Sequence, residues 1–377
     1  MIYRYIYIIA FFSLLACQAK VEKDAIPELV ELEIIDSILI KETDYFLNGQ
    51  KEVNMIGDSL IAVSSIKSPS VGFYEISGKQ RKRIASGDFP IGSFQPSNFD
   101  ATHYPIIYIL DKKSESVLVF NVVTQEFIEK IRLNLPEGKE AKFVGSKFRK
   151  LNSGFLIELA SSIFDNYDPA YYRESGQLIY QFNENGQSMD KSFLEYPKEL
   201  KDIQGSLKPI DYLVYTAFKE SYLFSFPHSR KILRFDGIDF GKLIEEIPLP
   251  KSRYFNFELR GSDQIVSFQE LFNSGGGMDV EVPSNHYFNA IIEVDDQIFI
   301  TTWMNNREDP PNNATFSNLL IYNKEEERWY ETSNPRNILD IGMLAGVVND
   351  TLYFYEGSLM KHDEKYIKRA VLKPIEE

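Results

Sequence analysis

The sequence has 377 residues, and its 41 Lys and Arg against 55 Asp and Glu give a formal charge of −14 at pH 7. This acidic balance argues against nucleic-acid binding, which needs a basic surface, and against attraction to anionic lipid headgroups. A chain of this length can bury a large core, and its aromatic content of 14%, with 28 Phe and 22 Tyr, favours β-strands.

The N-terminus has the layout of a secretory signal. Arg4 is the one charged side chain in residues 1–16, and residues 5–16 form an uncharged run. A membrane-spanning helix needs about 20 apolar residues, so residues 1–16 are predicted to be a signal peptide and not a transmembrane segment. Its removal would leave 40 Lys and Arg against 55 Asp and Glu, a formal charge of −15.

Cys17, the only cysteine, follows Leu14, Leu15 and Ala16 directly. This stretch resembles the lipobox of bacterial lipoproteins, in which the cysteine is acylated and becomes the new N-terminus. The resemblance implies membrane attachment through acyl chains, of which stable anchoring needs more than one. The expected location is the cell envelope, at the outer membrane, on its periplasmic or its surface face. The alternative is an ordinary signal peptide followed by a chance cysteine.

The rest of the chain divides simply. Residues 17–28 are polar and predict a short tether, and residues 29–377 show no linker, so they are expected to form one domain and a monomer. A thiol that is acylated at Cys17 is no longer available for catalysis, redox chemistry or zinc binding.

Short apolar strands separated by polar turns recur along residues 59–372 and predict an all-β fold. Residues 59–85, 105–133 and 221–249 share one pattern of three strands, and residues 155–193, 297–331 and 350–372 repeat it with insertions or in a shorter form. An aromatic residue closes the second strand of most copies: Tyr74, Phe120, Phe182, Phe235 and Tyr322, with Lys361 as the equivalent in the last copy.

Repeats of this size predict a β-propeller, whose blades contain about 40–50 residues and four strands. Six copies predict six blades, and a seventh is possible because 87 residues separate Phe235 from Tyr322. Residues 29–40 are expected to pair with the last blade and close the ring, which removes an exposed strand edge. A β-sandwich is the second interpretation, but its strands carry no such repeat.

Several segments together resemble a family of Bacteroidota-type lipoproteins known as domain of unknown function 4221. These are the lipobox, "IIDSILI" at residues 34–40, "GDFPIGSFQPSNF" at 87–99 and "YLFSFPHSRKILRFD" at 222–236. The resemblance would cover nearly the whole mature chain and implies a propeller-like protein anchored in the envelope. It provides no active residues that could be carried over.

No residue pattern predicts a metal site or a cofactor. The four histidines, His103, His228, His286 and His362, are too far apart in sequence to form a paired ligand motif. Acidic pairs occur at Asp165 and Asp168, at Asp236 and Asp239, and at Asp295 and Asp296, where solvated turns are the expected explanation. Nucleophile elbows, calcium loops and phosphate-binding loops are absent from the sequence.

The predicted function is therefore a non-catalytic envelope lipoprotein whose propeller binds a partner protein or a glycan. The alternative is a glycosidase-like, carbohydrate-active enzyme whose carboxylates come from several blades. A candidate ligand site follows the apolar run 297–302, where Trp303 precedes a long polar connection, residues 304–313, that contains Arg307 and Asp309. Exposed tryptophan beside charged and amide groups suits a sugar face or a partner protein. The competing explanation is that Trp303 packs between blades.

Overall fold

The computed structural model describes residues 25–42, 50–87, 89, 92–267, 269–270, 282–305, 315–356 and 364–375. The predicted signal peptide, Cys17, Arg307, Asp309, Lys361 and His362 lie outside these residues.

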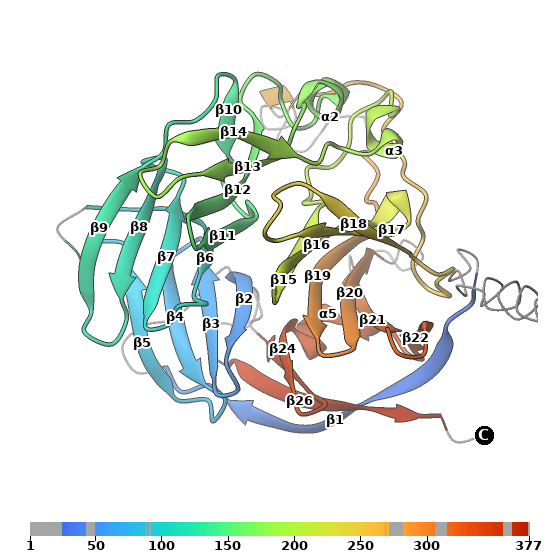
Figure 1. The fold of residues 1–377 in the computed structure, drawn as a ribbon. Helices are drawn as coiled ribbons and strands as arrows, with labels where there is room; N and C mark the ends of the chain where they lie inside the picture. Colours follow the sequence, from blue (N-terminus) through green and yellow to red (C-terminus); the bar gives the residue numbers. More distant parts are fainter. Residues whose placement is uncertain are drawn as a thin grey trace, which may run out of the picture.

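Four separate sheets, each an antiparallel meander, follow one another around a ring (Figure 1). The first contains β2 (Gln50–Ile56), β3 (Leu60–Ser65), β4 (Ser70–Glu75) and β5 (Gln80–Ala85). The second contains β6 (Pro96–Asp100), β7 (Ile106–Asp111), β8 (Ser116–Asn121) and β9 (Glu126–Arg132). The third contains β10 (Lys139–Ala141), β11 (Phe148–Leu151), β12 (Gly154–Ser161), β13 (Ile179–Phe182) and β14 (Ser188–Phe193). The fourth contains β15 (Val214–Phe218), β16 (Ser221–Phe226), β17 (Lys231–Asp236) and β18 (Leu243–Pro248).

The remaining strands form one nine-stranded sheet. It contains β19 (Tyr287–Val294), β20 (Gln297–Asn305), β21 (Thr315–Asn323), β22 (Arg328–Thr332), β1 (Glu28–Leu39), β26 (Tyr366–Pro374), β25 (Thr351–Glu356) and β24 (Met343–Val348), and β23 (Arg336–Asn337) pairs with β21. The all-β propeller arrangement is thus confirmed. The expectation of six or seven separate blades is not, because four blades stand as separate sheets and the last repeat units are merged.

The N-terminal strand β1 joins the last two groups of strands into one sheet. β1 pairs antiparallel with β26, with Leu32 opposite Leu372, and it also pairs parallel with β22, with Val30 opposite Thr332. The guanidinium of Arg369 binds the carboxylate of Asp36 across the first of these pairings. The predicted closure of the ring by residues 29–40 is confirmed, and Figure 1 shows β1 beside β26 at the ring edge.

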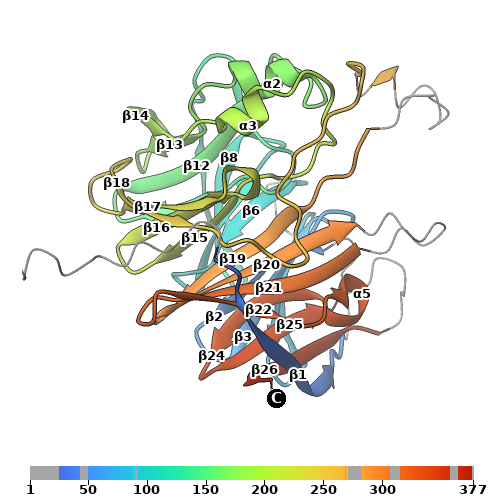
Figure 2. The same cartoon turned by 90° about the vertical axis from the view of Figure 1, so that its right-hand side faces the viewer.

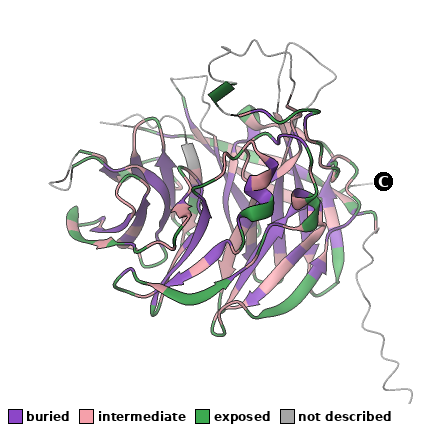
Figure 3. Ribbon diagram, turned by 90° about the horizontal axis from the view of Figure 1, so that it is seen from above, coloured by how far each residue is buried: buried purple, intermediate pink, exposed green. Residues whose placement is uncertain are grey.

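The described residues form six hydrophobic clusters, and each lies between neighbouring groups of strands. Phe73 of β4 and Phe120 of β8 share one cluster, for example, and Leu223 of β16 and Ile298 of β20 share another. Figure 3 shows the buried residues concentrated in the strands, with exposed residues in the turns and at the ring edge. Every sheet therefore depends on both of its neighbours for burial of its apolar faces.

No strand lies between β18 and β19 in the described residues 249–267 and 282–286. This part of the chain is a long connection and not the seventh blade that its length allowed. Glu331 of β22, fully buried, holds the connection by accepting hydrogen bonds from the Ser252 hydroxyl and from the Arg253 N–H at 2.9 Å.

The ring has two different faces. One, here called the turn face, has short connections between strands, such as Lys219–Glu220 between β15 and β16 and Asp295–Asp296 between β19 and β20. The other, the loop face, has long connections that include α2 (Pro169–Glu174) and α3 (Lys198–Lys201) (Figure 2). Two further short helices are η1 (Pro227–Ser229) and α5 (Ile338–Ile341).

Closure by β1 leads to a first prediction. Replacing Leu32, 8% exposed in β1, by alanine should lower the free energy of unfolding by about 2–5 kcal/mol, since it removes apolar contacts from a closed cluster. Ile35→Ala, at a position of the same strand that is 47% exposed, should cost about 1 kcal/mol or less. Urea unfolding of both variants provides the measurement. Equal losses would show that the closure does not depend on the buried face of β1.

Candidate functional site

A central channel with a cavity of about 1320 Å³ runs through the ring and is the candidate site. The first strand of each four-stranded meander lies innermost, so β2, β6, β11, β15, β19 and β24 contribute to its wall. Residues 142–144, 164–167 and 209–213, which belong to loop-face connections, line it as well. Cavities of this kind are the usual location of ligand sites on propeller and barrel scaffolds.

A group of paired charges lies in the channel wall between the third and fourth sheets. It contains Lys142, Lys147, Glu158 and Asp211, and is called the lysine–carboxylate cluster below. The Asp211 carboxylate binds Lys147 Nζ at 2.6 Å and Lys142 Nζ at 3.2 Å. Glu158, fully buried in β12, contacts Lys142 Nζ and accepts a hydrogen bond from the Lys147 N–H at 3.0 Å. The cluster therefore links two neighbouring sheets through side chains.

Both lysines of this cluster are held in the charged form. Burial alone would favour neutral lysine, but Asp211 and Glu158 outweigh it and raise the pKa of Lys142. Burial likewise opposes the charge on Lys147, and Asp211, Glu158 and Glu52 of β2 together raise its pKa. Because all these groups are near each other in a partly buried site, their charges are matched within the protein.

A second charged pair lies deeper in the channel. Asp100, at the end of β6, is 3.6 Å from Arg149 Nε and accepts a hydrogen bond from the Lys150 N–H at 2.7 Å. The Tyr215 hydroxyl is buried without a hydrogen-bond partner in the described part of the chain, and burial raises its pKa. Arg149 and Asp100 both act on that hydroxyl electrostatically.

Aromatic side chains gather where the channel opens on the loop face. Phe143 is 61% exposed, and the rings of Tyr287 and Trp303 meet edge to face with centroids 5.6 Å apart. Burial, followed by the Asp211 charge, raises the pKa of Tyr287, and Tyr287 lines the same channel as Asp211, Lys142 and Lys147. The aromatic rim is defined as Phe143, Phe164, Tyr167, Tyr287 and Trp303, all of which line the channel.

Of the three predicted ligand residues, Trp303 is the one that lies among the described residues. Trp303 does line the channel, but it lies within β20, which continues to Asn305 and does not end at residue 302. Its indole Nε1 is buried and makes no hydrogen bond within the described residues. Arg307 and Asp309 fall outside the described residues. A role for any of the three in binding stays a prediction.

His228 and His286 lie near each other, but no group of three or more His, Cys, Asp or Glu among the described residues is arranged to hold a metal ion. Buried His228 places Nδ1 2.8 Å from the Phe257 carbonyl, and burial lowers its pKa. His286 Nδ1 accepts from the Asn256 N–H at 2.9 Å. His103 meets the edge of Tyr108.

The acidic pairs noted in the sequence occupy turns. Asp168 caps α2 by accepting from the Ala170 N–H at 2.8 Å, and Asp165 accepts from the Tyr167 N–H at 2.9 Å. Asp236 accepts from two backbone N–H groups of its own turn, which lowers its pKa. Asp295 and Asp296 are exposed in the hairpin between β19 and β20.

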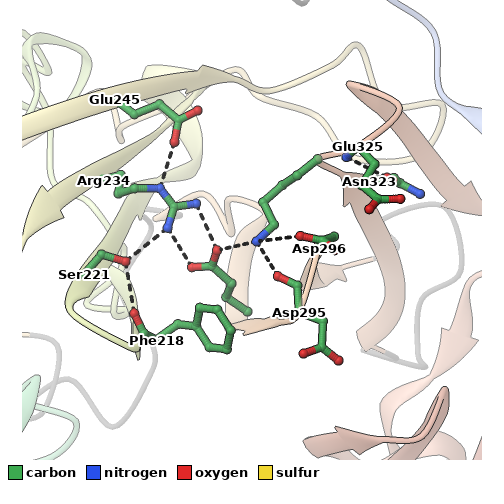
Figure 4. A network of polar contacts seen from close by, with 10 residues as sticks. Phe218, Ser221, Arg234, Glu245, Asp295, Asp296, Asn323 and Glu325 are labelled. Carbon is green, nitrogen blue, oxygen red and sulfur yellow. Dashed lines mark hydrogen bonds and ion pairs between the residues drawn. The ribbon is translucent and has the colours of Figure 1, made fainter.

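A further polar network lies on the turn-face side, between the fourth sheet and β19 (Figure 4). Buried Glu293 accepts hydrogen bonds from Arg234 at 2.9 and 3.0 Å and from Lys324 at 3.0 Å. Arg234 also binds Glu245 at 2.8 Å, and Lys324 lies 3.9 Å from Asp296. The network joins the fourth sheet to the sheet that contains β19, at the turn-face end of the channel.

The sequence patterns did not predict the lysine–carboxylate cluster. Its one sequence signal is Glu158, a charged residue inside the apolar run "GFLIELA" of β12. A carboxylate in such a run must be paired when it is buried. Its partner Lys142 comes from the connection before β11, and Asp211 comes from a connection far away in sequence, so no local pattern links the three residues.

No protein-family profile matches the chain, and no curated protein matches it by sequence. Among solved structures, a Bacteroides fragilis protein named as an exported one shares 14% identity with a TM-score of 0.55, over 93% of this chain and 100% of that chain. A streptogramin B lyase gives 10% identity and a TM-score of 0.42, over 91% and 98%. A β-propeller domain from Myceliophteria thermophila gives 8% and 0.41, over 89% and 99%. The first of these similarities shows a shared fold.

Among the described residues, no helix has the length and apolar character needed to cross a lipid bilayer.

The lysine–carboxylate cluster leads to a second prediction. Glu158→Ala should lower the free energy of unfolding by about 3–5 kcal/mol, because it leaves buried lysine charge with fewer partners. The control is Glu140→Ala in β10, which removes a more exposed pair with Lys112 at 2.7 Å and should cost at most about 1 kcal/mol. Chemical denaturation at neutral pH measures both. A loss for Glu158→Ala no larger than the control would contradict this account of the cluster.

Proposed function

We propose that this protein is a non-catalytic lipoprotein of the cell envelope, whose propeller binds a partner protein or a glycan at the loop-face mouth of its channel. The observation that carries the proposal is the mouth itself, where a cavity of about 1320 Å³ opens between an aromatic rim and a polar wall. Large aromatic surfaces beside a few fixed polar groups are typical of binding sites.

The contacts of the channel carboxylates favour binding over glycosidase chemistry. A glycosidase needs one carboxyl group that donates a proton and a second carboxylate that acts as nucleophile or base. Asp211 and Glu158 contact the buried lysines, and Asp100 contacts Arg149 and the Lys150 N–H. All three carboxylates are therefore already engaged by other groups of the protein, whereas a glycosidase keeps its two carboxyl groups available to the substrate.

The strand order of the nine-stranded sheet also bears on the number of blades in the ring. We infer six blades, because the nine-stranded sheet contains two meanders of four strands, β19 to β22 and β24 to β26 with β1, joined by the parallel pairing of β1.

The lipobox-like stretch and the exported character named for the B. fragilis protein support envelope localisation, at the outer membrane. We also propose membership of the lipoprotein family of domain of unknown function 4221.

Lipid anchoring at Cys17 is tested by Cys17→Ser in producing cells. The variant should remain unprocessed or leave the membrane fraction, since the serine hydroxyl cannot replace the sulfur that carries the acyl chain. Ala19→Ser, two residues further on, should stay processed and membrane-bound. Fractionation and mass spectrometry of the N-terminus are the measurements. Processing and envelope retention of Cys17→Ser at the level of the unaltered chain would show that the anchor is elsewhere.

The binding assignment is tested against catalysis. The purified full-length protein, incubated with oligosaccharide and peptide mixtures, is expected to release no products detectable by chromatography and mass spectrometry. Turnover that disappears in Asp100→Asn or in Asp211→Asn would establish the carbohydrate-active or hydrolytic alternative instead. Turnover unaffected by both changes would point to a contaminating enzyme, and the assignment would stand.

A further inference from the structure

The aromatic rim and the lysine–carboxylate cluster form one continuous surface at the channel mouth. Trp303 contacts Tyr287, and Tyr287 lies within electrostatic reach of Asp211. Asp211 in turn binds Lys142, which precedes exposed Phe143 directly in the chain. A ligand that enters the channel would therefore meet aromatic faces and polar groups in alternation, from β19 and β20 of one sheet to the connection before β11 of another.

The charges on this surface are already matched. Lys142 and Lys147 are paired with Asp211 and Glu158, so an anionic ligand would have to compete with internal carboxylates. A cationic ligand would face the two lysines at close range. Removing one partner from a buried charge pair is costly, and like charges at an interface are strongly unfavourable. The cluster thus matches its own charges, and the further carboxylates of the channel lining, Glu52 and Asp165, oppose an anionic ligand, so the wall favours a ligand without net charge.

The channel wall also contains polar atoms that lack partners. The indole Nε1 of Trp303 and the hydroxyl of Tyr215 are buried, line the channel and make no hydrogen bond within the described residues. A buried donor left without a partner costs about 1–3 kcal/mol. Both atoms are closed off from solvent, so a ligand hydroxyl, which both donates and accepts, would bond to them only after the Trp303 or Tyr215 side chain turns toward the channel.

From these observations we propose that the channel mouth binds a neutral oligosaccharide. This inference rests on the proposed binding function and names its ligand class. Sugar rings present apolar C–H faces that pack on aromatic rings, and their rims carry uncharged hydroxyls for the polar groups between those rings. The cavity volume, about 1320 Å³, exceeds the roughly 300–1,000 Å³ typical of small-molecule sites, which favours a chain of sugars over a single one.

The test uses the two tryptophans of the chain, Trp303 and Trp329, as reporters. Full-length protein in detergent is titrated with neutral hexasaccharides of glucose, mannose, xylose and galactose, and with a hexamer of galacturonate as the anionic comparison. At least one neutral probe should bind with saturation and change the tryptophan fluorescence. That change should persist in Trp329→Phe, whose indole is buried in the core, and disappear in Trp303→Phe.

Affinity measured by calorimetry should fall at least tenfold in Phe143→Ala and in Tyr287→Ala. Ile238→Ala, an exposed apolar position on the turn face, should leave it unchanged. Because Phe143 is 61% exposed, its removal should not change the melting temperature, so a loss of affinity there cannot be attributed to unfolding. An affinity that is unchanged in all of the rim variants would show that the sugar does not bind at the channel mouth.

The remaining outcomes separate this inference from the function on which it rests. Saturable binding of the galacturonate hexamer alone, or of no sugar at millimolar concentration, would overturn the neutral-glycan inference and leave a binding propeller in place. Binding of a neutral hexasaccharide followed by its cleavage would uphold the ligand class and overturn the non-catalytic function.

Discussion

Pairing between the two ends of the chain is the constraint on which the other parts of this fold depend. The apolar clusters lie between neighbouring groups of strands, so each sheet is buried only when the ring is complete. β1 completes it by pairing with β26 and β22 together, and the Asp36–Arg369 contact fixes the register. A closed ring also leaves fewer strand edges open to other chains. The channel exists because closure holds the inner strands around one axis.

The difference between the two faces follows from the strand order. In every meander, the connections at one end are tight hairpins, and the long excursions to the next sheet begin at the other end. Connections at this second end contain insertions, such as α2 between β12 and β13 and α3 between β14 and β15, without disturbing the sheets (Figure 2). Variable loops on a rigid scaffold are where binding surfaces commonly form. The aromatic rim lies on that face for this reason.

Buried ion pairs tie neighbouring sheets together at both ends of the channel. Asp211 joins the third and fourth sheets near the mouth, and Glu293 joins the fourth sheet to β19 near the turn face (Figure 4). Such pairs add little net stability, because desolvation offsets much of their attraction, but they penalise wrong arrangements strongly. Their contribution is better understood as holding the sheets, and with them the channel wall, in one relative position.

The sequence by itself determined the β class, the repeated strand pattern and the partner of the N-terminal strand. These follow from local alternation of apolar and polar residues and from the need to cover a sheet edge. The solvated turns at Asp236 and Asp295 could be predicted for the same reason, since their hydrogen bonds are local or their side chains reach water. Only the tertiary structure decided that β1 also joins β22, that residues 249–267 form no blade strand, and that Lys142, Glu158 and Asp211 meet. Those contacts connect residues that belong to different strands and connections, and their energies depend on burial and charge pairing that no local pattern encodes.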